Sequence, residues 1–141
     1  MLIVVTAVVT GCIKARDTAN PVLQPQGSFT GDFYRIHTNF QSKVKDTIKL
    51  TLGLELVNNT YKITGDTSKH AGSKGTFNYN QSYIEWTDGT LPIGANGLKM
   101  PKYHLYGPYL YFYDGTKLEF RATTYPIDTL TYIYKLKKIT N

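Results

Sequence analysis

TIKLTLGLEL, residues 47–56, alternates without interruption between polar or small residues and aliphatic residues. Successive side chains of a strand point to opposite faces of a sheet, so this pattern predicts a strand with one buried and one exposed face. Ile48 and four leucines would form the buried face. The stretch therefore favours an all-β fold built from half-buried strands.

Shorter apolar and aromatic runs lie on both sides of this stretch. They predict strands at residues 29–37, 61–63, 75–80, 82–87, 109–114, 117–122 and 129–137. Most connections are too short for a crossover helix, so consecutive strands should be antiparallel neighbours. Eight such strands with one apolar face predict a closed up-and-down barrel, because closure removes the exposed strand edges. A two-sheet β-sandwich is the alternative.

Two segments, YIEWTDGT (residues 83–90) and YLYFYDGT (residues 109–116), resemble each other. Both contain Asp-Gly, a pair that favours the type I′ turn of a hairpin. In the first segment, Ile84 and Trp86 should face the core because polar residues alternate with them. The same phase in the second segment places Leu110 and Phe112 inside the barrel. The side chains predicted to point outward are then Tyr109, Tyr111, Tyr113, Lys117 and Arg121.

The barrel interior is the first candidate binding site. Eight strands enclose a space just large enough for packed side chains or for one small ligand. The candidate lining residues are Leu50, Leu52, Tyr61, Trp86, Phe112, Phe120, Tyr132 and Tyr134. These side chains either fill the barrel or surround a small apolar ligand, and the sequence leaves both interpretations open.

The outward tyrosines are the second candidate. Tyr109, Tyr111 and Tyr113, beside Lys117 and Arg121, predict a contact surface for a glycan or a protein, including a hydrolase to be inhibited. The competing interpretation is ordinary cross-strand pairing with cation–π contacts.

The chain carries no recognisable catalytic or metal-binding motif. It lacks Gly-x-Ser-x-Gly and a phosphate-binding loop, and His37, His70 and His104 are far apart. We interpret each histidine as a polar surface residue, and Asp88 and Asp114 as turn residues. We therefore expect no enzyme, no metal and no cofactor.

The formal net charge is +6. This charge favours anionic partners such as lipid headgroups or acidic glycans, although excess lysine that keeps a protein soluble is the alternative. The lysines are scattered, so we do not expect nucleic acid as a partner.

The first residues predict an export signal. Residues 2–11, LIVVTAVVTG, are uncharged but too short to span a membrane. The run ends in Val9-Thr10-Gly11-Cys12, which resembles the bacterial lipobox. That resemblance implies a signal peptide at residues 1–11 and a lipid anchor on Cys12. It also implies a location in the bacterial cell envelope, on the periplasmic face or at the outer membrane.

Residues 12–27 have the proline- and glutamine-containing composition of a tether, which leaves residues 28–141 as one domain. The opening GSFTGDF (residues 27–33) and the final strand LTYIYKLKK (residues 130–138) resemble the lipocalin-like, calycin-type domains of Bacteroidetes lipoproteins. The resemblance implies a lipocalin-like barrel that binds a ligand or a partner without catalysis.

Overall fold

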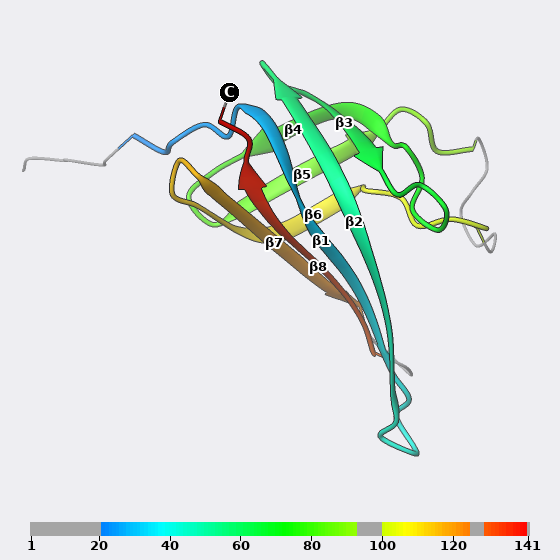
Figure 1. The fold of residues 1–141 in the computed structure, drawn as a ribbon. Coiled ribbons are helices and arrows are strands. Elements are labelled where there is room, and N and C mark those ends of the chain that lie inside the picture. The colour runs from blue at the N-terminus through cyan, green and yellow to red at the C-terminus, as the bar shows by residue number, and fades with distance from the viewer. Residues whose placement is uncertain (1–20, 93–99, 125–128, 141) are drawn as a thin grey trace, which may run out of the picture.

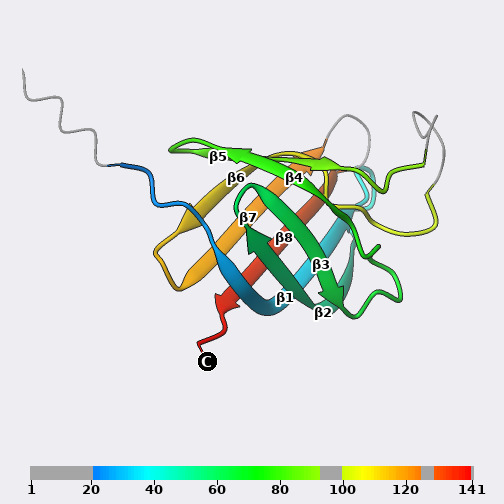
Figure 2. The same ribbon diagram turned by 90° about the horizontal axis from the view of Figure 1, so that it is seen from above.

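The computed structural model describes residues 21–92, 100–124 and 129–140. Within these residues every regular element is a strand, and the eight strands form one closed antiparallel barrel in chain order (Figures 1 and 2). The strands are β1 (Gly27–Thr38), β2 (Lys45–Val57), β3 (Thr60–Gly65), β4 (Lys74–Tyr79), β5 (Tyr83–Asp88), β6 (Gly107–Tyr113), β7 (Lys117–Thr124) and β8 (Thr129–Lys138). The predicted all-β, eight-stranded barrel is confirmed, and the sandwich alternative is not what the chain forms.

The alternation in β2 acts as predicted. Leu50, Leu52, Leu54 and Leu56 are buried, whereas the residues between them are exposed or half-buried. Leu54 lies opposite Phe29 on β1 and opposite Ile63 on β3, so three neighbouring strands contribute to the same inner face. Removing this face from water is the main local driving force for the strand.

Aromatic rings fill the middle of the barrel. The rings of Phe120 and Tyr134 stack with their centroids 4.4 Å apart, and Trp86 lies 5.1 Å from Phe120 and 5.3 Å from Phe77. All four side chains are buried. This part of the interior is therefore a packed core.

The faces of β6 are the reverse of those predicted. Tyr109 is only 4% exposed, whereas Leu110 and Phe112 are 43% and 60% exposed. Tyr109 lies opposite Ile84, and Tyr111 lies opposite Phe120, so the tyrosines share the inner face of the barrel. Tyrosine can occupy this face because its hydroxyl finds a partner, as when Tyr111 donates to the Asn80 carbonyl at 2.7 Å.

The two Asp-Gly pairs also differ from each other. Asp114-Gly115 joins β6 to β7 in a tight turn, but the positive φ is at Gly115 alone, whereas a type I′ turn needs two. Asp88-Gly89 is not a hairpin turn, because it leads into the long connection between β5 and β6. The side chain of Asp88 instead points to the inner face in phase with Trp86. Aligning the segments on Asp-Gly therefore gave the wrong phase for β6.

The barrel has two different ends. The chain enters β1 and leaves β8 at one end, where the turns are short (Figure 1). At the other end, β3 pairs with β2 only between Leu52 and Val57, so the β1–β2 hairpin projects beyond β3. We call this second end the mouth. Across residues 21–92, 100–124 and 129–140, no helix has the length and apolar character required to span a membrane.

Candidate ligand site at the mouth of the barrel

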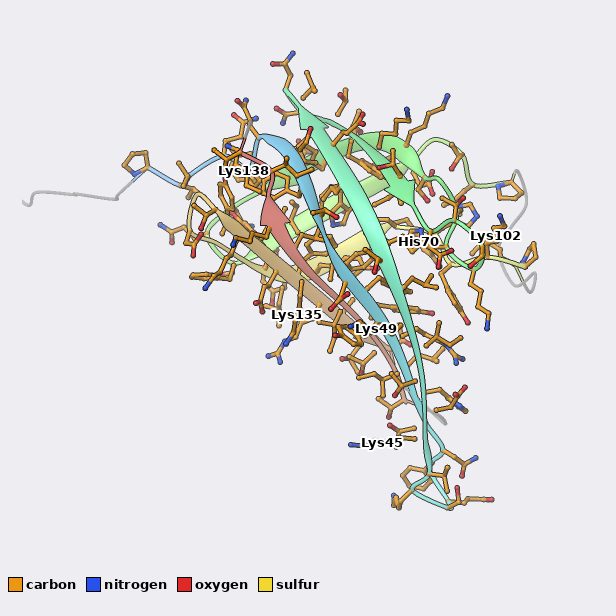
Figure 3. The ribbon with its side chains drawn as sticks, in the orientation of Figure 1. Lys45, Lys49, His70, Lys102, Lys135 and Lys138 are labelled. Atoms are coloured by element: carbon orange, nitrogen blue, oxygen red, sulfur yellow. The ribbon has the colours of Figure 1, made fainter. Side chains whose placement is uncertain are left out.

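The segment of residues 100–106 lies at the mouth and is held by hydrogen bonds to the β3–β4 connection. The Ala71 amide donates to the Tyr103 carbonyl at 2.7 Å, and the Tyr103 amide donates to the Lys69 carbonyl at 2.9 Å. The Lys102 ammonium donates to the Thr67 carbonyl at 2.7 Å. Figure 3 shows Lys102 and His70 at this end, and Lys138 at the opposite end. The segment is thereby fixed to the β3–β4 connection.

A cavity of about 530 Å³ lies between this segment and strands β6, β7 and β8. Its wall is largely aromatic and aliphatic, with a few polar side chains. The lining residues are Met100, Lys102, Tyr103, His104, Tyr106, Gly107, Pro108, Tyr109, Ala122, Thr123, Thr124, Leu130 and Tyr132. This size and this mixture are typical of sites for small organic ligands.

His104 is the best-anchored polar group of the cavity wall. Its Nδ1 lies 2.8 Å from Oδ2 of Asp88 and 3.4 Å from Oγ of Ser73. Burial raises the pKa of Asp88, but hydrogen bonds from Thr90, Ser73 and His104 outweigh this effect and leave the pKa below its ordinary value. The carboxylate is therefore ionised at neutral pH and fixes the orientation of the imidazole.

Ser73, His104 and Asp88 are the residue types of a hydrolytic triad, but their arrangement is different. In a triad, the serine and the carboxylate contact opposite nitrogens of the imidazole. Here both contact the same nitrogen, Nδ1. The Ser73 hydroxyl also accepts a hydrogen bond from the Leu105 amide at 3.2 Å. The cluster of Ser73, Asp88 and His104 therefore holds His104 and Leu105 in place at the cavity wall.

His70 lies between this site and the core. It is 0% exposed, and its Nδ1 donates to the Ala71 carbonyl at 2.6 Å. Nε2 of the neutral ring then accepts a hydrogen bond from the Tyr134 hydroxyl at 2.7 Å. Burial lowers the pKa of His70 to about 4, so the ring is neutral at physiological pH. The interpretation of His70 as a surface histidine was wrong, because His70 is fully buried, and His104 is half-buried at the cavity wall rather than on the open surface.

Most of the candidate lining residues predicted from the sequence lie in the packed core and do not line this cavity. Of that set, Tyr132 lines the cavity and Phe112 lies on the outer surface. The members buried in the packed core are Leu50, Leu52, Tyr61, Trp86, Phe120 and Tyr134. These aromatic and aliphatic side chains therefore fill the core of the barrel, and the space for a ligand is at the mouth.

The predicted outward row of tyrosines does not form. Tyr109 is buried, and Tyr111 and Tyr113 are half-buried against the core. Lys117 and Arg121 do point outward. A shallow groove of about 350 Å³ on this outer face is instead lined by Leu110, Tyr111, Phe112, Glu119, Phe120, Arg121 and Ile133. The proposed lipidation site, Cys12, lies outside the described residues.

Tyr103, His104 and Tyr106 line the cavity, although sequence reasoning did not name them as lining residues of a cavity. The one signal was the concentration of tyrosine just before β6. Asp88 and His104 are 16 residues apart, and nothing local marks them as a pair. In the described parts of the chain, no three His, Cys, Asp or Glu side chains are grouped as a metal site requires.

Comparisons with protein-family models, with curated proteins and with solved structures gave no match. The geometry of the mouth therefore carries the functional argument.

Proposed function

We propose that this protein is a non-enzymatic binding module that takes a small apolar ligand into the cavity at the mouth of its barrel. The observation that carries this proposal is the cavity of about 530 Å³, whose wall is largely apolar and aromatic. A space of this size lined by such side chains removes apolar ligand surface from water, and the few polar groups orient the ligand.

The packed core sets the depth of the site. Tyr109 and Tyr132 line the cavity, and both pack against the rings below it. Phe33 stacks on Tyr132, and Phe120 packs edge-on against Tyr109. The ligand would therefore rest on an aromatic floor at the mouth rather than pass down the barrel axis.

The geometry of His104 supports a binding role over a catalytic one. Because Ser73 and Asp88 share Nδ1 of this ring, the serine is not paired with the nitrogen that would act as its base. The imidazole is instead a fixed polar group in an otherwise apolar wall.

We further propose a lipid anchor on Cys12 and a location in the bacterial cell envelope. The support is the lipobox-like residues 9–12 and the tether-like composition that follows. Because the chain enters β1 at the end opposite the mouth, an anchored domain would hold its cavity away from that anchor. Mass spectrometry of the protein from its native host should find an acylated Cys12 at the amino terminus. An unmodified Cys12 would contradict the anchor.

Filling the cavity tests the binding role. Ala122 lies on the cavity wall, so Ala122→Phe places a ring in the space that a ligand would occupy. We expect native mass spectrometry and calorimetric titration with dodecanol to show binding that is about tenfold weaker or lost, because the ring displaces apolar ligand contact.

Phe112→Ala is the matched control, because Phe112 borders the outer groove and not the cavity. It should bind dodecanol as the unmodified chain does. Equal binding by Ala122→Phe, in a variant that remains folded, would place the ligand elsewhere.

A further inference from the structure

The turn between β1 and β2 projects from the mouth end of the barrel (Figure 1). Thr38 and Lys45 form the last paired row of the two strands. Thr38 also pairs with Thr129, the first residue of β8. Residues 39–44 therefore extend past the last row that β1 shares with either neighbouring strand. We call residues 39–45 the tip.

The tip presents two large apolar side chains to water. Phe40 and Val44 are each 64% exposed, and among the described residues no large apolar side chain is more exposed. Single exposed apolar residues are common on protein surfaces, but these two share one tight turn at the end of a projecting hairpin. A surface that covered both would gain the free energy of removing them from water.

Hydrogen bonds fix the conformation of the tip. The Asn39 amide donates to the Val44 carbonyl at 3.0 Å, and the Lys43 amide donates to the Asn39 carbonyl at 3.0 Å. The side-chain oxygen of Asn39 accepts hydrogen bonds from the amides of Gln41 and Ser42 at 3.0 and 2.8 Å. A turn held in this way loses little conformational entropy when its side chains bind a surface.

The tip is also basic. Lys43 and Lys45 are exposed, and the Lys43 ammonium lies 4.3 Å from the centre of the Phe40 ring. Asp46 follows in the chain, but its carboxylate is paired with Arg35 at 3.4 Å. Figure 3 shows Lys45 at this end of the hairpin. The two lysines therefore leave a net positive charge beside the exposed apolar side chains.

The backbone of the turn does not explain the lysine at position 43. The φ angle of Lys43 is 58°, in the left-handed region that glycine adopts at lower cost than any residue with a Cβ atom. Glycine would therefore suit the turn better than lysine does. A non-glycine residue in this conformation points to a role for its side chain.

We propose that the tip is a membrane-contact site: Phe40 and Val44 enter the head-group region of an anionic lipid bilayer, and the two lysines bind its phosphates. Apolar side chains beside basic ones are typical of segments that lie at a bilayer surface, where each lysine stem extends so that its charge reaches the head groups. The net charge of +6 adds a longer-range attraction to such a surface.

The small size of the tip favours a lipid surface over a protein partner. A stable protein interface uses about 20–30 residues on each side, whereas the tip is a single turn. A turn of this kind enters a head-group layer without needing a complementary shape. The contact is separate from the anchor proposed on Cys12, because the chain enters β1 at the opposite end of the barrel.

The test measures flotation of the full chain with lipid vesicles. Every sample carries Cys12→Ser, which prevents acylation, and every sample shares the apolar residues 2–11, so differences between variants isolate the tip. Vesicles of phosphatidylcholine alone are compared with vesicles of phosphatidylcholine and phosphatidylglycerol in equal parts. We expect binding to the mixed vesicles that weakens as salt is added, and binding to the neutral vesicles that is at least about tenfold weaker.

The apolar residues of the tip have matched controls elsewhere in the chain. Phe40→Ser should weaken binding to the mixed vesicles about tenfold, and Val44→Ser should weaken it less, because less apolar surface is lost. The controls are Phe112→Ser and Val57→Ser. Phe112 is 60% exposed on the outer groove, and Val57 is 64% exposed at the end of β2 furthest from the tip. Both controls should bind as the unmodified chain does.

The lysine variants separate binding from folding. Lys43→Gly should keep the melting temperature of the unmodified chain, because glycine suits this φ, and should bind mixed vesicles about fivefold more weakly. Lys45→Ser should weaken binding by a similar factor. Lys135→Ser is its control: Lys135 is exposed on β8, and about 20 Å of strand separate it from Thr129 beside the tip. This distance exceeds the Debye length of about 8 Å, so binding should change by less than about twofold.

A tryptophan at the tip locates the contact. Phe40→Trp places an indole at the tip, and Phe112→Trp places one at the outer groove. Trp86 is 2% exposed and contributes the same signal to both variants. Brominated phosphatidylcholine in the mixed vesicles should quench the added fluorescence of Phe40→Trp and leave that of Phe112→Trp unchanged.

Unchanged vesicle binding by Phe40→Ser, or equal quenching in the two tryptophan variants, would overturn the membrane contact at the tip. Failure of the unmodified chain to bind either kind of vesicle would also overturn it, and is the result expected if the tip docks on a protein instead. Each of these results leaves the dodecanol test of the cavity untouched, so the membrane contact and the proposed ligand site stand or fall separately.

Discussion

Phe120→Ala should lower the free energy of unfolding by about 3–5 kcal/mol, the range found when a buried aromatic side chain is removed. Phe120 is 1% exposed and its ring contacts those of Tyr134, Trp86 and Tyr109. Removing it leaves a cavity at the centre of the aromatic core that rigid strands on all sides cannot close. Urea unfolding followed by Trp86 fluorescence measures the change.

Phe112→Ala is the matched control, with the same substitution on the neighbouring strand. Phe112 is 60% exposed and faces the outer groove. Its replacement should therefore change the free energy of unfolding by no more than about 0.5 kcal/mol. A large loss for Phe112→Ala together with a small loss for Phe120→Ala would reverse the faces of β6 and β7 described above.

Stability should fall when the pH is lowered from about 6.5 to about 4, because of His70. Its pKa is about 6.5 in the unfolded chain, and burial lowers it to about 4 in the folded chain. Between these pH values the unfolded state binds more protons than the folded state. The free energy of unfolding therefore decreases as the pH falls from about 6.5 to about 4. The shift corresponds to a loss of up to about 3 kcal/mol across this window.

The lowered carboxyl pKa values act in a different pH range. Hydrogen bonds from residue 68 hold the pKa of Asp66 below 3.8, and those from residues 116 and 117 do the same for Asp114. Their contribution is present above the ordinary carboxyl pKa and is lost only as the pH falls through the lowered values. These carboxyl groups therefore act mainly below the pH window in which His70 takes up its proton.

Urea unfolding at several pH values tests this account. His70→Gln keeps a group that can hydrogen-bond to the Tyr134 hydroxyl but cannot take up a proton in this range. The variant should be less stable at pH 7 and should show a weaker dependence on pH down to about 4. A flat stability profile of the unmodified chain over the same range would contradict a buried, neutral His70.

The sequence was sufficient to predict the barrel because its main signal is local. The alternation in residues 47–56 defines β2 by itself, and short turn-bounded runs define the other strands within two residues of their observed ends. Closure then follows from the number of strands and the lack of crossover connections. No long-range information was needed for these steps.

The phase of β6 could not be predicted in the same way. YLYFY, residues 109–113, contains no polar residue to mark an outer face, so hydropathy does not distinguish its two sides. The hydrogen bond from Tyr111 to the Asn80 carbonyl and the packing of Tyr109 against Phe120 and Tyr134 depend on tertiary neighbours. Burial of phenols is decided by those neighbours rather than by the pattern.

The candidate site at the mouth was even harder to predict from the sequence. Asp88 contacts His104, and Arg35 contacts Tyr103, across gaps in the chain that only the closed barrel brings together. Arg35 also breaks the rule that inner positions are apolar, so the alternation in β1 does not predict its inward position.

The location of a bound ligand is the central claim, and nuclear magnetic resonance measures it directly. In a titration of the labelled chain with dodecanol, the largest amide shifts should come from Tyr103, Tyr106, Ala122 and Tyr132 at the mouth. Amides of the outer groove, such as those of Leu110 and Ile133, should move little. Shifts concentrated at the outer groove, or no shifts at saturating dodecanol, would contradict a ligand site at the mouth of the barrel.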